Sequence, residues 1–119
     1  MTRIYKLLDR SEWLAAEAQG LFDGSAVDAA DGYIHFSTAA QLGETGRRYF
    51  TGRANLVLLA VDAAALGEAL RWEPSRGGDL FPHLYAPLPI AQVIAVRDVA
   101  LGPDGAPALE PAHLGALGL

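Results

Sequence analysis

Two short segments of the chain carry the side chains whose types and spacing suit chemistry. In residues 31–38 (DGYIHFST), polar and apolar side chains alternate around a histidine, His35. In a strand, this alternation places Tyr33, His35 and Ser37 on one face and the apolar residues between them on the other. A face with a phenol, an imidazole and a hydroxyl is suited to holding a polar ligand. The alternative is a histidine at the edge of the core, satisfied by one backbone partner.

The second segment is residues 81–85 (FPHLY), in which alternation places Phe81, His83 and Tyr85 on one side of an extended chain. We interpret this segment as the wall of a site opposite the wall that contains His35. Aromatic faces could hold a flat ring, and His83 could form a hydrogen bond to a reacting group. The alternative is an aromatic patch that covers a sheet edge.

Glu73 is the one carboxylate that lies inside a strand-like apolar segment. As a functional group it could act as a general base or stabilise a positive charge. As a structural group it would lie on a solvated strand face and pair with Arg71 or Arg76. The sequence leaves both roles open, and we take Glu73 and His83 as the candidate catalytic residues.

A helix is expected to begin directly after the His35 segment. Thr38 and Gln41 have the spacing of a capping box, in which each side chain bonds the backbone N–H of the other residue. The free N–H groups and the positive dipole end of such a helix suit a phosphate or a carboxylate. Arg47, further along the helix, could bind a phosphate if it faces the site. Arginine on a solvated helix face is the alternative.

Several other chemistries have no support in the sequence. The chain has no cysteine, which excludes disulfides, thiolate catalysis and cysteine-ligated metal sites. The two histidine segments contain neither an i,i+4 histidine pair nor a His-x-Glu cluster, so no metal site is predicted. Ser37 lacks the Gly-x-Ser-x-Gly elbow of a serine nucleophile, and no glycine-rich nucleotide loop is present.

Length and composition predict one globular domain, residues 1–119. Hydrophobic residues make up 51% of the chain and charged residues 19%, which is enough to bury a core. The net charge of −5 argues against direct nucleic-acid binding. The first residues lack the apolar core of a signal peptide, and the longest apolar runs are far shorter than a membrane span. We therefore expect a cytoplasmic protein, away from the membrane, whose partner is a small molecule; the oligomeric state stays open.

The expected secondary structure places these residues on strands and at a helix start. Strands are expected at residues 4–8, 33–36, 55–61, 70–73, 80–85 and 90–99. Helices are expected at residues 11–19 and 38–50, with a loop at 21–31, a turn or short helix at 62–69 and a loop at 74–79. A tail rich in glycine, proline and alanine begins at about residue 102. Two N-terminal helices packed on a compact, largely antiparallel sheet form an α+β fold.

These motifs together resemble a bacterial domain-of-unknown-function family, number 952. The resemblance runs from residue 4 to about residue 99. It rests on DGYIHFST (31–38), the helix at 41–50, the apolar strand at 55–61, RWE (71–73) and FPHLY (81–85).

The resemblance implies an ADP-ribosyltransferase-like fold, a split and largely antiparallel sheet that binds NAD in its cleft. His35 with Ser37 resembles the histidine and small hydroxyl residue that contact the adenosine ribose and the nicotinamide side in such enzymes. Tyr85 or His83 would then take the aromatic or second-histidine role. Phe36 stands where such enzymes have a glycine directly after the histidine.

Three hypotheses for function follow. The first is an NAD-binding enzyme that transfers or removes ADP-ribose: His35 orients the ribose, Tyr33 or Tyr85 stacks on the nicotinamide, and Glu73 or His83 polarises the acceptor. The second is a non-catalytic module that binds a nucleotide or another phosphorylated metabolite. The third is a structural or partner-binding domain in which both histidines are packing residues. The distance between the two histidines, and the presence of a cleft between them, separates the third hypothesis from the others.

Overall fold

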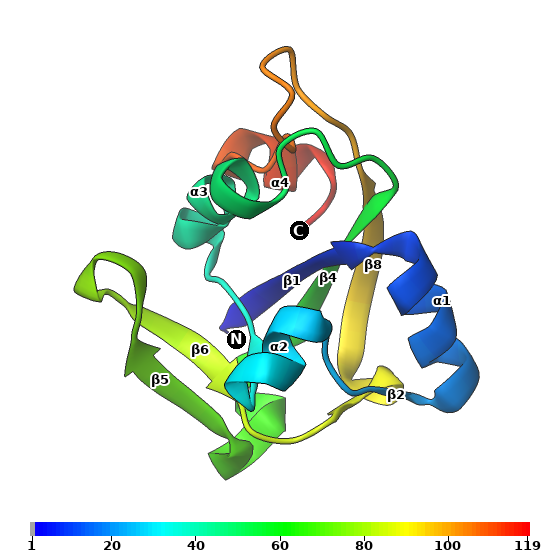
Figure 1. The fold of residues 1–119 in the computed structure, drawn as a ribbon, viewed down its shortest axis with the longest axis vertical. Coiled ribbons are helices and arrows are strands. Elements are labelled where there is room, and N and C mark those ends of the chain that lie inside the picture. The colour runs from blue at the N-terminus through cyan, green and yellow to red at the C-terminus, as the bar shows by residue number, and fades with distance from the viewer. Residues whose placement is uncertain (1) are drawn as a thin grey trace.

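The strand with the longest apolar run, β4 (Leu56–Asp62), lies at the centre of a three-stranded antiparallel sheet (Figure 1). In the computed structural model, which describes residues 2–119, β4 pairs with β1 (Arg3–Asp9) on one side and with β8 (Val93–Val99) on the other. Residues 56–61 are all buried, because β4 has neighbours at both edges and is covered on both faces. The continuous apolar run predicted this central position.

A second three-stranded antiparallel sheet contains the two histidine segments. Its strand order is β3 (Ile34–His35), β6 (Leu80–Leu84) and β5 (Leu70–Pro74). The segment after β3 joins this sheet to the first one, because Tyr5 and Ser37 exchange two backbone hydrogen bonds of 2.8 and 2.9 Å. Two short strands, β2 (Leu21–Phe22) and β7 (Leu88–Pro89), form a separate pair. The fold is therefore α+β, as predicted, with its antiparallel strands divided among several sheets.

The helices agree in part with the prediction. The two expected helices are α1 (Arg10–Gln19) and α3 (Ala39–Tyr49), which end within one residue of the predicted bounds. A third helix, α2 (Ala26–Asp31), occupies residues predicted as loop, and this prediction was wrong. The side chain of Asp28 accepts the Ser25 N–H at 2.8 Å, so a local cap stabilises a helix too short to show an apolar period.

The remaining segments are short. Residues 63–69, 76–78 and 90–92 form 3₁₀ turns, named η1 (Ala63–Ala69), η2 (Arg76–Gly78) and η3 (Ile90–Gln92). Helix α4 (Pro111–Ala116) lies in the tail. Among the helices of residues 2–119, none has the length and apolar content that a membrane crossing requires.

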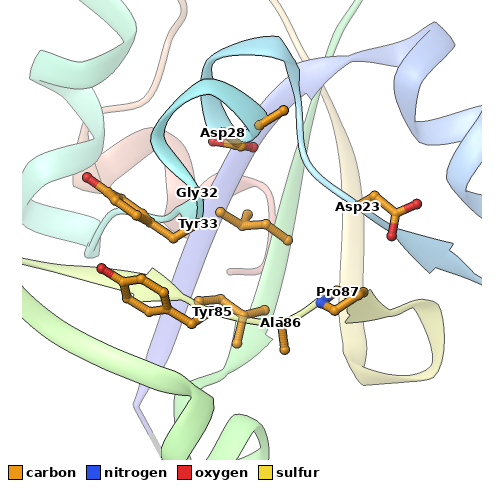
Figure 2. Close-up of a pocket in the computed structure, with 10 residues that line it drawn as sticks. Asp23, Asp28, Gly32, Tyr33, Tyr85, Ala86 and Pro87 are labelled. Carbon is orange, nitrogen blue, oxygen red and sulfur yellow. The ribbon is translucent and has the colours of Figure 1, made fainter.

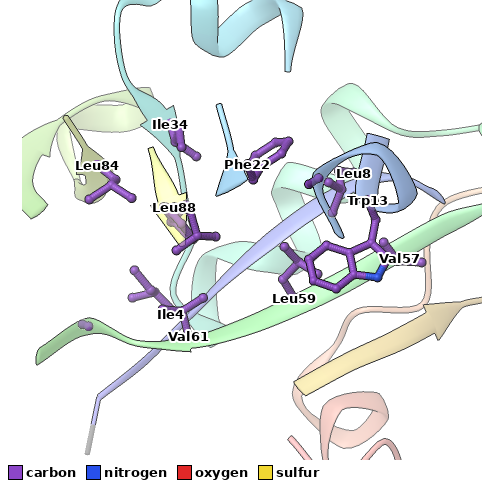
Figure 3. Packing of buried hydrophobic residues seen from close by; sticks show 13 residues of the cluster. Ile4, Leu8, Trp13, Phe22, Ile34, Val57, Leu59, Val61, Leu84 and Leu88 are labelled. Carbon is purple, nitrogen blue, oxygen red and sulfur yellow. The ribbon is translucent and has the colours of Figure 1, made fainter. Parts of the chain in front are cut away.

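The two faces of β4 pack against two different cores. Val57, Leu59 and Val61 belong to one cluster, which includes Trp13 of α1 (Figure 3). The alternate residues of β4 face a second cluster, which includes Leu42 of α3. Strand β1 is held in place because it pairs with β4, which is packed on both faces. The segment after β3 is held in turn by the hydrogen bonds between Ser37 and Tyr5 of β1.

The C-terminal tail is docked against α3. Its Leu109 is 1% exposed and belongs to the second core. A Cβ atom added to Gly46 would lie 3.0 Å from a methyl group of Leu109, and one added to Gly43 would lie 2.8 Å from Glu110. The two glycines in the middle of α3 therefore have a packing reason: they let the tail approach the helix closely.

We predict that Leu109→Ala lowers the free energy of unfolding by about 3 kcal/mol, because it leaves a cavity between the tail and α3. Leu101→Ala is the matched control, since Leu101 lies in the same part of the chain but is 38% exposed. Urea unfolding should show a change below about 1 kcal/mol for this control. Equal effects of the two substitutions would contradict the docking of the tail.

Candidate functional site

The two histidines lie directly opposite each other on neighbouring strands. His35 of β3 pairs with His83 of β6, and their ring centroids are 5.6 Å apart. The prediction of two opposing walls was therefore wrong, because these two segments are hydrogen-bonded neighbours and form a single wall. A cleft lies over this wall rather than between the two segments.

The predicted alternation of the side chains is confirmed. Ile34, Phe36 and Leu84 are buried in the first core. His35 and His83 line the cleft on the other face. The two histidines therefore do not lie on separate sides of the molecule, which was the observation that would have favoured the hypothesis of two packing residues.

The cleft has a volume of about 480 Å³, which is within the size range of small-molecule sites. The wall formed by the two strands contributes Tyr33, His35, Ser37, Phe81 and His83 to it. Strand β1, helices α2 and α3, the segment after α3 and the loop after β5 contribute the remaining sides. Four of the residues predicted for a site, Tyr33, His35, Ser37 and His83, thus line one cleft.

His83 is held by Glu73 from the neighbouring strand β5. Its Nδ1 lies 2.8 Å from a Glu73 oxygen, which also accepts the Tyr85 hydroxyl at 2.6 Å. These hydrogen bonds, from Tyr85 first and then from His83, lower the pKa of Glu73, and the same contact raises the pKa of Tyr85. A carboxylate only accepts, so Nδ1 of His83 carries the proton. Its Nε2 has no hydrogen-bond partner within residues 2–119 and is not fully buried, so it is free to accept a proton in the cleft.

His35 has a carboxylate at each ring nitrogen. Its Nδ1 lies 2.6 Å from Oδ1 of Asp28, and its Nε2 lies 2.9 Å from Oδ2 of Asp31. Both nitrogens must carry a proton for both contacts to be favourable, since neither carboxylate donates one. The Nδ1 contact is a hydrogen bond, and the Nε2 contact is an ion-pair distance. The side chain is 29% exposed, so a ligand in the cleft can reach it.

Asp28 is a buried carboxylate on which three elements meet. It accepts the backbone N–H of His35 at 3.1 Å in addition to the His35 ring, and its oxygens lie 2.9 and 3.0 Å from Nζ of Lys6 on β1. Burial opposes its ionisation, but the bond from His35, the charge of Lys6 and the Ser25 N–H outweigh burial and lower its pKa to about 2. Burial also lowers the pKa of Lys6, although Asp28 opposes that change.

The sequence reasoning missed both Asp28 and Lys6. Asp28 stands in a segment that was predicted as loop, and Lys6 interrupts an apolar strand. Lys6 is only 6% exposed, and a lysine inside an apolar strand was the signal that could have indicated a buried partner. Within residues 2–119, no three histidine or carboxylate side chains are arranged to hold a metal ion.

Tyr33 connects the aromatic groups of the site. Its ring centroid lies 4.1 Å from His83, 4.6 Å from His35 and 5.1 Å from Tyr85. Burial and then the neighbouring carboxylates, Asp31 before Glu73, raise the pKa of its phenol. The phenol therefore stays protonated and serves as a hydrogen-bond donor or as a surface for stacking.

The basic part of the cleft contains an arginine that the sequence reasoning did not place in the site. Arg76 donates to the Thr45 hydroxyl at 3.2 Å, and this hydroxyl lies 3.2 Å from the Ser37 hydroxyl. Glu44 is shared between Arg76, at 3.3 Å, and Arg48, at 3.2 Å. Two guanidinium groups with one carboxylate leave one positive charge in excess beside the cleft.

Two predicted anion-binding groups lie elsewhere. The Thr38 hydroxyl accepts the Gln41 N–H at 3.2 Å and Gln41 accepts the Thr38 N–H at 3.0 Å, so the capping box is confirmed. These contacts occupy the hydroxyl of Thr38, which does not line the cleft. Arg47 forms an ion pair with Glu110 of the tail and does not line the cleft either. The side of α3 that carries Leu42 and Thr45 lines the cleft, whereas Thr38 caps the helix and Arg47 meets the tail.

A second, shallower cavity of about 300 Å³ lies on the other side of Tyr33, between α2 and the chain after β6. Figure 2 shows Tyr33 and Tyr85 side by side at one end of this cavity and Asp23 toward the other end. Tyr33 borders both cavities, whereas Tyr85 borders only this one. Tyr85 and Glu73 thus lie on the same face as His83, and Glu73 contacts His83 there, but neither of them lines the cleft.

We predict that Asp28→Asn lowers the free energy of unfolding by about 3 kcal/mol at neutral pH, because it leaves the charge of Lys6 buried without a partner. Asp31→Asn, on the same helix, should cost less than about 1 kcal/mol, since Asp31 is exposed. The double variant Lys6→Met with Asp28→Asn should recover part of the loss. Urea unfolding of the four proteins measures these differences, and a loss for Asp28→Asn no larger than that for Asp31→Asn would contradict the role of Asp28.

The effect of Asp28→Asn should also depend on pH. The pKa of Asp28 is lower in the folded protein, at about 2, than its ordinary value of 3.8. Its ionisation therefore stabilises the fold fully above about pH 4, and this contribution is lost as the pH falls toward about 2. The difference in unfolding free energy between the parent and Asp28→Asn should shrink over that interval. A difference that stays constant would contradict the assignment.

Comparison with known proteins places the chain in a family. Residues 7–96 match the family model described as a protein of unknown function (DUF952). The chain is similar to protein CC0527 from Caulobacter crescentus. The X-ray crystal structure of that protein is 57% identical over 96% of this chain and 99% of that chain, with a TM-score of 0.92.

The solution NMR structure of CC0527 is also 57% identical, covering 98% of this chain and 99% of that chain, with a TM-score of 0.86. No curated protein matches the chain. Neither the family description nor the names of the solved structures specify a ligand or a reaction. The matched residues include β3, β5 and β6, which carry the wall of the cleft. The chain therefore belongs to the DUF952 family.

Proposed function

We propose that the chain is an enzyme that binds a nucleotide in this cleft, with NAD as the first candidate, and that transfers or hydrolyses its ADP-ribose part. The observation that carries the proposal is the pairing of His83, whose Nε2 is free to accept a proton, with His35 on the same wall of the cleft. A histidine oriented by a carboxylate through one nitrogen is a common form of general base.

The cleft offers groups for both parts of a nucleotide. Tyr33 presents an aromatic ring beside the two histidines, which suits stacking on a flat heterocycle. The excess positive charge of the Arg76 and Arg48 pair suits a pyrophosphate. The Thr45 hydroxyl donates to the Gln41 carbonyl and accepts from Ser37 and Arg76, so the guanidinium groups are the donors for the phosphates.

The cleft offers groups that suit the ring and the phosphates of NAD, but it lacks the backbone contact for the carboxamide that the resemblance implies. Where the enzymes that the chain resembles have a glycine, the N–H of Phe36 donates to the Pro82 carbonyl at 3.0 Å. The Phe36 ring is 2% exposed and points into the core. The backbone after His35 is therefore not free to hold the amide of a nicotinamide, and a side chain of the cleft must do so.

The roles of the chain's own residues follow from their contacts. Bound NAD would supply a ribosyl group that already carries a good leaving group. Nε2 of His83 would take the proton of the acceptor, a water molecule or a hydroxyl. Glu73 would stabilise the imidazolium that forms on His83, and the Tyr85 hydroxyl would hold Glu73 in position. His35 would donate a hydrogen bond to the ribose.

The second candidate function is a non-catalytic module that binds a nucleotide or another phosphorylated metabolite. The engaged N–H of Phe36 favours it, because it removes a contact specific to nicotinamide and leaves the phosphate-binding groups unchanged. In this case the basic side chains would determine affinity, and His83 would act only as a hydrogen-bonding group.

We predict that calorimetry detects NAD binding and that Arg76→Ala weakens it about 10-fold, because a charge-assisted hydrogen bond is lost. Arg47→Ala is the matched control, since Arg47 is an exposed arginine that does not line the cleft. It should bind NAD like the parent protein.

His83→Asn should keep NAD binding within about threefold and lower NAD consumption at least about 100-fold, because it removes the general base. His113→Asn, in the tail helix, is the matched control and should leave both quantities unchanged. Binding without consumption in the parent protein would favour the non-catalytic module. Absence of both heat and NAD consumption would exclude NAD as the ligand.

A further inference from the structure

His35 and His83 have different sets of acidic partners. His35 has carboxylates at both nitrogens, from Asp28 and Asp31, which is the setting of a doubly protonated ring. His83 has one carboxylate, Glu73 at Nδ1, and its Nε2 is free. A proton donor and a proton acceptor thus lie with their ring centroids 5.6 Å apart on one wall.

A proton donor beside a proton acceptor suits some leaving groups of a ribosyl carbon better than others. Nicotinamide leaves a ribosyl carbon as a neutral molecule and needs no proton. An alkoxide is a strong base, so a ribosyl group linked through oxygen to an alcohol is released easily only if an acid protonates the departing oxygen. A cleft with an acid next to a base is therefore better matched to an O-linked leaving group than to a pyridinium.

The charges around the pair favour reaction at a sugar carbon. Asp31 lies beside His35, Glu73 lies beside His83, and the Tyr33 ring lies against both histidines. Carboxylates and aromatic faces stabilise the positive charge that develops on a ribosyl carbon in the transition state. The same groups would oppose the negative charge that develops in phosphoryl transfer.

We propose that the cleft hydrolyses ribosyl groups that are linked through oxygen, with His35 as the general acid and His83 as the general base. The bond from the anomeric carbon to the leaving oxygen breaks first, and its electron pair remains on that oxygen, which takes the proton of His35 Nε2. A water molecule then forms a bond to the positively charged ribosyl carbon from the side on which that oxygen left, where both histidines lie, and His83 Nε2 takes a proton from that water. The two histidines then exchange protons with solvent.

The proposed step requires His35 Nε2 to reach the substrate. In the structure this nitrogen contacts Asp31, whose side chain is 46% exposed at the end of α2, so the leaving oxygen can take its place. The other nitrogen stays on Asp28, which is 1% exposed and keeps the ring oriented. The proposal rests on the proposed function in one respect, which is that the cleft accommodates ADP-ribose.

The test compares two substrates with the same sugar and different leaving groups. One is a peptide that carries ADP-ribose on a serine oxygen, and the other is 4-nitrophenyl ADP-ribose, whose nitrophenolate leaves without a proton. The full chain should release ADP-ribose from both. His35→Asn should lower the rate on the serine peptide at least about 100-fold and the rate on the nitrophenyl substrate less than about fivefold. His83→Asn should lower both rates, and His113→Asn neither.

The outcomes separate this proposal from the proposed function. ADP-ribose that binds in calorimetry, with no release from the serine peptide, would overturn the hydrolysis and leave nucleotide binding in place. Absence of ADP-ribose binding would overturn both. An equal loss of rate on both substrates in His35→Asn would overturn the role of His35 as acid. His35→Gln is a second variant without an acidic proton, and it should show the same selective loss as His35→Asn. Thermal unfolding of each variant at the temperature of the parent protein would show that the proton donor, and not the fold, was lost.

Discussion

The buried carboxylate of Asp28 is the interaction on which the geometry of the site depends. It accepts hydrogen bonds from a backbone N–H in its own turn, from the backbone and ring of His35, and from Lys6. A buried charge is tolerated only with good partners, so the loss of any one of these contacts is costly. Asp28 thereby joins α2, β3 and β1, and it presents His35 to the cleft with one ring nitrogen already occupied.

The second constraint is the register between β3 and β6. Direct pairing of His35 with His83 brings both rings to the same face, and a shift of one residue would turn one of them into the core. The register between β6 and β5 adds the carboxylate, because Glu73 pairs with Phe81 and reaches its diagonal neighbour His83. Three short strands therefore place the histidine pair and the Glu73 partner of His83, whereas α2 supplies the two acidic partners of His35.

Local patterns predicted more of the elements than of their arrangement. The capping box at Thr38 predicted the start of α3, and the apolar run of β4 predicted a central strand, because both signals depend on neighbours in sequence. Helix α2 was not predicted, because its six residues are too few to show the apolar period of a helix. The sequence indicated Arg47 for the site, but the packing of the tail on α3 pairs Arg47 with Glu110. It did not indicate Arg76, because only the tertiary structure brings the loop after β5 against Thr45 and Glu44 of α3.

The sequence by itself determined which side chains share a face. The period of two in residues 31–38 and 81–85 required Tyr33 to lie with His35, and His83 to lie opposite Leu84, whatever the fold. Only the tertiary structure decided that the two segments are adjacent strands rather than opposing walls, and that Lys6 meets Asp28 across the chain. Strand pairing and burial bring together residues that are far apart in sequence. Whether a buried carboxylate such as Asp28 stays ionised depends on the balance between its desolvation and the charge of its partner, and that partner is known only from the tertiary structure.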